Sequence, residues 1–126
     1  MNSNDQLTIL EVDNLTKRYG PVTAVDGISF TIYQGEVLGF LGPNGAGKST
    51  TIDLITTLQK PSAGHITYPG LTETNQPHEV RQHIGIVPQE LAIYGSLSVR
   101  DNLTYIGKMY GLPSSQLKPR IDTLLK

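Results

Sequence analysis

The sequence predicts an α/β fold, and three neighbouring stretches indicate it. Val37–Leu41 is a short apolar run of the kind that forms a buried strand. The glycine-rich segment 42–50 follows it directly. Beyond that segment, Ile52, Ile55 and Leu58 recur three residues apart, which predicts a helix with these three side chains on its core face. The glycine-rich segment is therefore expected to join a strand to a helix.

Segment 42–50 fits the pattern of a phosphate-binding loop: Gly, four residues, Gly, Lys, then Ser or Thr. Glycines let backbone N–H groups approach a row of phosphates, and the first turn of the next helix adds its own N–H groups. The ammonium group of Lys48 is expected to reach the β- and γ-phosphates, and the hydroxyl of Ser49 to bind Mg²⁺. An ordinary glycine-rich turn is the alternative. The candidate binding residues are Gly42, Pro43, Asn44, Gly45, Ala46, Gly47, Lys48, Ser49 and Thr50.

Composition narrows the function classes. The 126 residues suffice for one small domain, and the net charge of −1 offers no strong basic field, so nucleic acid is not expected as a main partner. The absence of cysteine excludes disulfides and thiolate metal sites. No apolar run approaches the roughly 18 residues that a membrane-spanning helix needs. The histidines His65, His78 and His83 lack metal-ligand spacing and are interpreted as surface or packing residues.

Further patterns predict the other elements. Segment 14–21 is interpreted as a turn-rich link, and Gln34-Gly35 as the tight turn of a hairpin that ends in Val37–Leu41. Ser98 and Asp101 resemble a helix capping box, and Gly111, which follows the apolar face of that helix, is interpreted as its C-terminal cap. Pro119 leaves the start of the last helix undetermined. The predicted strands are 7–12, 28–32, 65–68 and 84–87, and the predicted helices are 77–83, 98–110 and 117–125.

An ATP-hydrolysing phosphate-loop protein needs more than the loop. It needs an acidic group on Mg²⁺, usually an Asp at the end of an apolar strand, and a polar group that positions the attacking water. No run of four apolar residues ending in Asp follows Lys48, and Asp53 on the first helix is expected to face away from the metal. We therefore expect the chain to be the N-terminal part of a larger domain.

Five segments carry a family resemblance by their order and spacing. They are Leu15-Thr16-Lys17-Arg18-Tyr19-Gly20, segment 42–51, Pro61-Ser62-Ala63-Gly64, Ile84-Gly85-Ile86-Val87-Pro88-Gln89, and Leu97–Leu103. Together they resemble the N-terminal half of the nucleotide-binding subunit of an ATP-binding cassette (ABC) transporter. The segments around Pro88-Gln89 and Tyr110-Gly111 look most similar to bacterial export-type cassettes.

This resemblance implies the architecture of the chain. It implies a P-loop NTPase core of the ABC type with an N-terminal antiparallel β-subdomain, over about residues 7–89, and the start of a helical subdomain over 90–126. The family's signature motif, second acidic motif (Walker B) and switch histidine have no counterpart before Lys126. The 126-residue chain alone is therefore expected to bind ATP weakly at most and to show no sustained turnover.

The resemblance also assigns roles to single residues. Tyr19 corresponds to the aromatic residue that stacks on adenine, with a turn tyrosine packed on the sheet as the alternative. Gln89 corresponds to the glutamine that ligates Mg²⁺ and senses the γ-phosphate, and with Lys48 it forms the candidate catalytic set. Leu91, Ile93 and Tyr94 correspond to the surface where transmembrane permease subunits dock, although they could equally pack under the helical lobe.

The complete protein is expected to bind MgATP, to dimerise head to tail with a second ATP-binding subunit, and to hydrolyse ATP to drive transport. The resemblance places it in the cytoplasm, on the inner face of the cell membrane through its membrane subunits. Two alternatives remain: a soluble ABC ATPase acting in DNA repair or on the ribosome, and a nucleotide-binding module without turnover.

Overall fold

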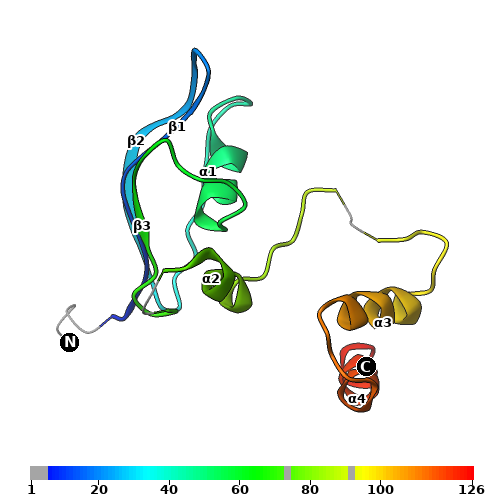
Figure 1. The fold of residues 1–126 in the computed structure, drawn as a ribbon. Helices are drawn as coiled ribbons and strands as arrows, with labels where there is room; N and C mark the ends of the chain where they lie inside the picture. Colours follow the sequence, from blue (N-terminus) through cyan, green and yellow to red (C-terminus); the bar gives the residue numbers. More distant parts are fainter. Residues whose placement is uncertain (1–5, 73–74, 91–92) are drawn as a thin grey trace. The chain divides into compact units, whose positions relative to one another are not determined.

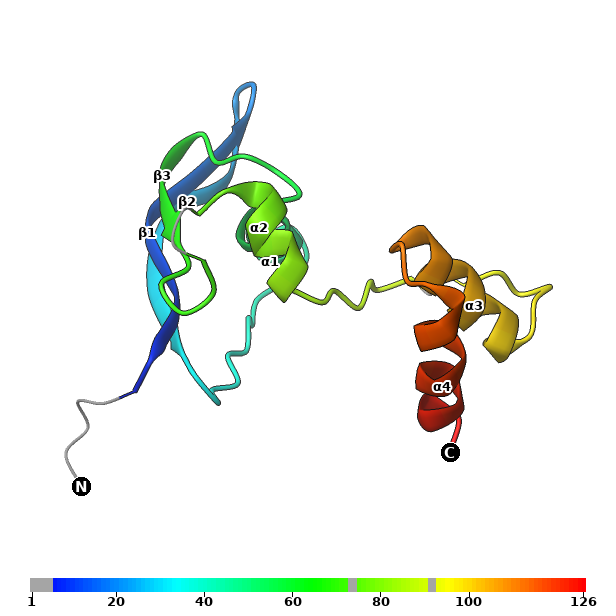
Figure 2. The ribbon, with the colours of Figure 1, turned by 60° about the horizontal axis from the view of Figure 1, so that its bottom comes forward.

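The computed structural model of the chain describes residues 6–72, 75–90 and 93–126. The chain divides into two compact units, Met1–Ile86 and Val87–Lys126. Figures 1 and 2 show the helices and strands of each unit.

The first unit is built on a three-stranded antiparallel sheet with the strand order β2-β1-β3. β1 (Thr8–Tyr19) pairs with β2 (Val22–Tyr33) along one edge and with β3 (Ala63–Thr67) along the other. The expected antiparallel β-subdomain at the N-terminal side is therefore confirmed.

β1 is longer than the sequence pattern predicts. The predicted turn-rich link 14–21 is wrong, because the strand continues to Tyr19 through a shift of register around Asn14. Asn14 has a left-handed φ of 47°, a conformation that asparagine tolerates better than most residues. Its N–H donates a hydrogen bond of 2.8 Å to the Oγ of Ser29, so the backbone donor at the irregularity is satisfied.

Two helices cover one face of this sheet. α1 (Lys48–Ile55) and α2 (Pro77–His83) lie on the same side of it in both ribbon views (Figures 1 and 2). The core between helices and sheet draws on both layers. Its buried residues are Leu10, Val12, Leu15, Val25, Leu54, Tyr68 and Val80.

The predicted core face of the first helix is wrong in two of its three members. Ile52 and Leu58 are 41% and 58% exposed, whereas Thr51 and Leu54 are the buried residues of α1. Ile55 is partly buried and packs against the core. The helix ends at Ile55, so Leu58 lies beyond it, and a three-residue spacing alone does not decide which face meets the sheet.

Two predicted strands, Val37–Leu41 and Ile84–Val87, are also wrong, because neither segment has regular secondary structure. Val37 and Leu41 are 96% and 97% exposed, and Val87 is 92% exposed. A strand needs neighbours that take up its backbone hydrogen bonds, and the described residues pair with neither segment. The predicted hairpin into Val37–Leu41 is wrong for the same reason: β2 pairs with β1 instead.

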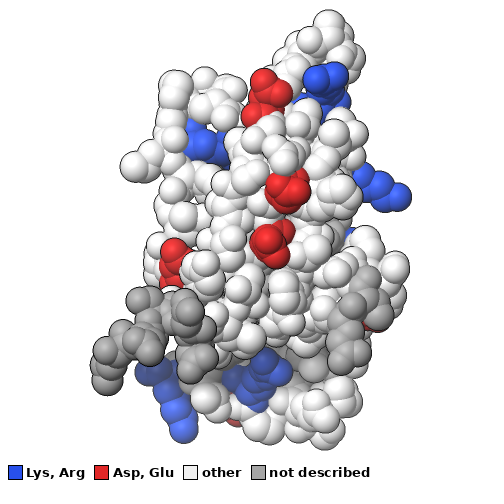
Figure 3. All heavy atoms as spheres, turned by 90° about the vertical axis from the view of Figure 1, so that its left-hand side faces the viewer, with Lys and Arg blue, Asp and Glu red and all other residues white. Residues whose placement is uncertain are grey.

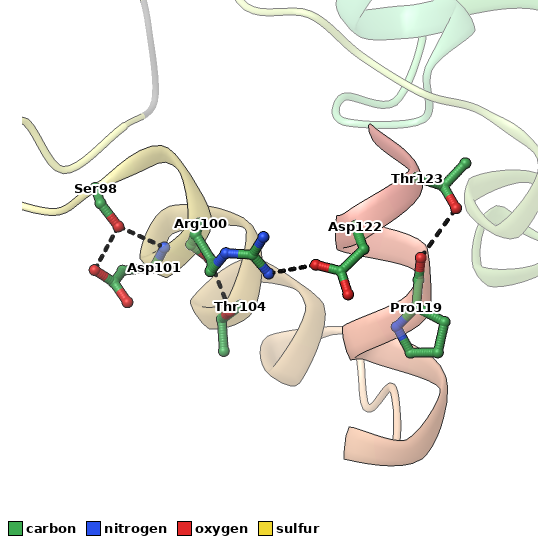
Figure 4. A network of polar contacts seen from close by, with 7 residues as sticks. All are labelled: Ser98, Arg100, Asp101, Thr104, Pro119, Asp122 and Thr123. Atoms are coloured by element: carbon green, nitrogen blue, oxygen red, sulfur yellow. Dashed lines mark hydrogen bonds and ion pairs between the residues drawn. The ribbon is translucent and has the colours of Figure 1, made fainter. Parts of the chain in front are cut away.

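The second unit contains two helices, α3 (Val99–Met109) and α4 (Ser114–Leu124). The predicted capping box is confirmed: the Oγ of Ser98 accepts the N–H of Asp101 at 3.1 Å and donates to the carboxylate of Asp101 at 2.6 Å (Figure 4). Gly111 follows the C-cap of α3 with a φ of 74°. α4 begins at Ser114 and contains Pro119 within it.

Polar and apolar contacts join α3 to α4. An ion pair of 2.6 Å connects Arg100 of α3 with Asp122 of α4 (Figure 4). A Cβ at Gly107 would lie 2.2 Å from a methyl group of Leu117, so the glycine permits the close approach of the helices. Within the described ranges, no helix is both long and apolar enough to cross a membrane.

Tyr68 ties the end of the sheet to α1. Its side chain is 3% exposed, and its hydroxyl donates to the carbonyl of Ile55 at 2.9 Å. Its backbone N–H donates to the Oδ1 of Asn75 at 2.8 Å. Burial disfavours the phenolate and raises the pKa of Tyr68 to about 12.

We predict that Tyr68→Phe lowers the unfolding free energy at neutral pH by about 1 kcal/mol, because one buried hydrogen bond is lost. Between pH 10 and 12 the folded wild type retains a proton that its unfolded state releases, so wild-type stability is complete below about pH 10 and falls as the pH rises. Urea unfolding at several pH values should therefore show a shallower alkaline decline in Tyr68→Phe.

Tyr110→Phe is the matched control, since Tyr110 is 84% exposed. An alkaline decline that is as steep in Tyr68→Phe as in the wild type would contradict the assignment of this titration to Tyr68.

Candidate functional site

Residues 42–47 of the glycine-rich segment form a loop that leads into α1, and residues 48–50 are the first residues of that helix. Gly45 and Gly47 have φ values of 86° and 83°, in the left-handed region that favours glycine. α1 has no side-chain cap at its N-terminus and no acidic residue in its first turn. The positive end of the helix is therefore free of a competing carboxylate on its own first turn, which suits an anionic ligand.

Gly47 presses the end of the loop against β2. A Cβ on Gly47 would lie 2.2 Å from the carbonyl oxygen of Ala24, so only glycine fits this approach without a backbone shift. The hydroxyl of Thr51, which is 3% exposed, donates to the carbonyl of Gly47 at 2.9 Å. This contact of Thr51 with Gly47 was not predicted from the sequence. The only sequence signal for it is the run of hydroxyl residues 49–51.

The side chain of Lys48 folds back over the loop. Its ammonium group donates to the carbonyl oxygens of Gly42 and Pro43, both at 2.7 Å. A phosphate oxygen carries charge and is a stronger acceptor than a neutral carbonyl, so a phosphate placed here would compete well for the same ammonium group. Ser49, the candidate metal ligand, is exposed on the first turn of α1, and Thr50 beside it is half-buried.

Tyr19 lies at the end of β1 in the same unit as the loop, and its side chain is 46% exposed. Its hydroxyl donates to the Oε1 of Gln59, and the ammonium group of Lys17 lies 5.1 Å from the centre of its ring. A half-exposed ring with a fixed edge has the surface that a flat base needs for stacking. The contact with Gln59 was not predicted, because Gln59 lies outside the five segments that carry the resemblance, and Lys17 lies in one of them but was given no role of its own.

Gln89 belongs to the second unit, where it is exposed on a bend. The loop residues 42–50 and Tyr19 thus belong to the first unit, whereas Gln89 belongs to the second. The assigned roles of Gln89, Tyr19 and the loop residues stay predictions.

The predicted docking residues lie in the second unit, except that Leu91 falls outside the described residues. Ile93 and Tyr94 are 58% and 52% exposed. The ring of Tyr94 meets that of Tyr105 of α3 edge to face, with 5.2 Å between the ring centres. This contact raises the pKa of the Tyr94 phenol through a hydrogen bond and Coulombic repulsion from Tyr105.

Asn102 of α3 anchors the segment that precedes the helix. Its side chain is 7% exposed, and its amide nitrogen donates to the carbonyls of Tyr94, Leu97 and Ser98 at 3.0–3.2 Å. Its amide oxygen accepts the N–H of Tyr94 at 2.8 Å. The half-exposed ring of Tyr94 is therefore held in place on α3 rather than buried beneath it.

Charged side chains are dispersed over the face shown in Figure 3. Most of the Asp and Glu side chains follow one another down the middle of that view, whereas the Lys and Arg side chains lie apart toward its edges, so no basic patch forms on the described part of that face. Such a face offers no electrostatic footprint for duplex nucleic acid. The expectation that nucleic acid is not a main partner stays a prediction.

Comparison with known proteins identifies the family. The sequence pattern of the ABC transporter family matches residues 25–126, so the chain belongs to this family. It is 46% identical over 118 residues to the linearmycin resistance ATP-binding protein LnrL of Bacillus subtilis, covering 94% of this chain and 38% of the relative. It is 40% identical over 118 residues to the Nod factor export ATP-binding protein I of Ralstonia nicotianae, covering 94% of this chain and 37% of the relative.

The fold has solved counterparts in the same family. The structure of cbiO1 from Clostridium perfringens, part of the ABC transporter complex cbiONQ, matches with a TM-score of 0.77 and 31% identity over 95% of this chain and 50% of that one. The predicted α/β fold of the ABC type is thereby confirmed. The chain spans less than two fifths of the length of the two curated relatives above.

We predict that Gly47→Ala lowers the unfolding free energy more than Gly45→Ala does. Both substitutions place alanine at a left-handed φ, which costs about 1–2 kcal/mol. Only position 47 also forces a Cβ against the carbonyl of Ala24, and relief of that overlap costs about 1–3 kcal/mol more. Urea unfolding of the two variants measures the difference.

Gly45 is a matched control because a Cβ there has nothing within 4 Å. Equal losses at the two positions would show that the contact between the loop and β2 does not constrain the loop.

Proposed function

We propose that the chain supplies the nucleotide-binding loop of the ATP-binding subunit of an ABC transporter. One observation carries the proposal: the ammonium group of Lys48 lies over a glycine-bent loop at the uncapped N-terminus of α1. The backbone N–H groups of the loop, the helix end and the ammonium group all favour a polyphosphate. Family membership supports ATP as the ligand.

The phosphates would be bound from three directions. Loop residues Asn44–Gly47 would donate backbone N–H groups, and the first turn of α1 would add further donors. Lys48 would exchange its two carbonyl partners for oxygens of the β- and γ-phosphates. The close contact of Gly47 with β2 would keep the loop in shape while the ligand enters.

The donor set fits Mg²⁺ in its chemistry. Magnesium prefers oxygen ligands and usually takes few of them from the protein. The hydroxyl of Ser49 and the side-chain amide oxygen of Gln89 are such ligands, and both side chains are exposed. The bound ion would neutralise charge on the phosphates. Through this ion, Gln89 would link the presence of the γ-phosphate to the second unit, Val87–Lys126.

Hydrolysis and transport would belong to the full-length protein. Within the described residues, no three histidine, cysteine, aspartate or glutamate side chains form a group that could hold a metal ion. We propose that the second metal carboxylate and the group that positions water lie outside these 126 residues, since the chain covers 38% of the length of the relative LnrL. Head-to-tail dimerisation with a second ATP-binding subunit would complete the site.

The names of the relatives favour transport over a soluble role in DNA repair or on the ribosome. One relative is named for linearmycin resistance and another for Nod factor export. The exposed side chains of Ile93 and Tyr94 offer an apolar contact for permease subunits, because Asn102 and Tyr105 hold Tyr94 with half of its surface free. The subunit would then lie on the cytoplasmic face of the membrane.

We predict that Lys48→Ala weakens MgATP binding by the full-length protein about 10- to 100-fold, because charge-assisted hydrogen bonds contribute about 1.5–3 kcal/mol. Isothermal titration calorimetry measures the dissociation constant. Lys118→Ala is the control, since this lysine is exposed on α4 and lies outside the proposed site. An affinity within twofold of the wild type for Lys48→Ala would contradict the proposal.

A further inference from the structure

A chain of side-chain hydrogen bonds links Tyr19 to α1. The Tyr19 hydroxyl donates to the Oε1 of Gln59, and the Nε2 of the same amide donates to the Oδ2 of Asp53 at 3.2 Å. Asp53 lies on α1, and Gln59 lies just beyond its C-terminal end. The amide thus uses both ends at once, as acceptor for the phenol and as donor to the carboxylate.

The backbone reinforces this connection. The carbonyl of Asp53 accepts the N–H groups of Leu58 and Gln59 at 2.9 and 3.1 Å. The segment after α1 is therefore fastened to the helix by main chain and side chain together. Both Asp53 and Gln59 are partly buried, which protects their hydrogen bond from competing water.

One face of the Tyr19 ring is also occupied. The ammonium group of Lys17 lies 5.1 Å from the ring centre, and it donates to the carbonyl of Lys60 at 2.8 Å. Segment 59–62 further clamps the strand itself, because the N–H of Arg18 donates to the Oγ of Ser62 at 3.0 Å. The ring is thus fixed at its hydroxyl edge and on one face, while 46% of the side chain remains exposed.

We infer that Asp53 and Gln59 are positioning residues that hold the ring of Tyr19 as a preformed platform for the nucleotide base. The inference rests on the proposed nucleotide-binding function and adds to it a physical link between its two halves. The phosphates bind at the N-terminus of α1, and the base platform is bonded through Gln59 to Asp53 on the same helix.

Preorganisation of the Tyr19 ring would favour binding of the nucleotide base. A ring that is free to rotate must lose that freedom when a base stacks on it, and this loss weakens binding. A ring already held by its hydroxyl avoids most of the loss. The benefit applies only to a ligand that has a base, because a bare polyphosphate never touches the ring.

The test compares MgATP with magnesium tripolyphosphate, which has the phosphates but no base, on the full-length protein. Gln59→Leu removes the acceptor at similar volume. It should weaken MgATP binding about three- to tenfold, the effect of one lost hydrogen bond, and change tripolyphosphate binding less than twofold. Tyr19→Phe removes the same bond from the other side and should give the same selective loss, with no further loss in the double variant.

Exchanging the amide and the carboxylate between positions 59 and 53 should restore MgATP binding. Gln59→Glu keeps an acceptor for Tyr19 but sets two carboxylates against each other in place of the 3.2 Å bond to Asp53, so MgATP binding should weaken. Adding Asp53→Asn restores a donor–acceptor pair, and binding should return to within twofold of the wild type. Gln82→Leu, at an exposed glutamine of α2, controls for the added apolar side chain.

The outcomes separate the two claims. A wild-type protein that binds neither ligand would overturn the proposed function. A wild type that prefers MgATP while Gln59→Leu and Tyr19→Phe keep the same preference would overturn only the positioning role. Equal weakening of both ligands in the two variants would also overturn it, since a general loss of structure does not distinguish the base from the phosphates.

Discussion

The contact between Gly47 and the carbonyl of Ala24 is the constraint on which the candidate site depends. It fixes the end of the loop against β2 at a distance that excludes any side chain. α1 begins at the next residue, so the helix end and Lys48 are set by the same contact. Thr51 then secures the carbonyl of Gly47 from within the helix. The sheet therefore determines where a phosphate would be bound, although no strand residue belongs to the motif.

The same sheet positions the aromatic side chain. β1 runs without interruption from the core residue Leu10 to Tyr19, and the irregularity at Asn14 lets the strand continue where a turn was expected. β3 and the segment before it return to β1 through the bonds of Ser62 with Thr16 and Arg18. Loop, helix and aromatic ring are thus parts of one unit with a shared core.

Some of this was predictable from sequence because the signals are local. The loop motif, the capping box at Ser98 and the helix 77–83 each depend on a few adjacent residues, and each appears where the pattern places it. The antiparallel sheet and the family followed from several motifs that agree in order. The hydrogen bonds of Gln59 with Tyr19 and with Asp53 were not predictable, because the first joins residues 40 positions apart and depends on where the segment after α1 lies against β1.

The two strand predictions that were wrong also depended on contacts between distant residues. Val37–Leu41 and Ile84–Val87 have the composition of buried strands, but the described residues offer them no paired neighbour, and composition alone does not form a sheet. The central claim, that the loop binds a nucleotide through its backbone, is tested most directly by following its amide resonances while MgATP is added to the folded full-length protein. The account predicts large shifts at Gly45, Gly47 and Lys48. Unmoved resonances at these three residues under saturating MgATP would contradict it.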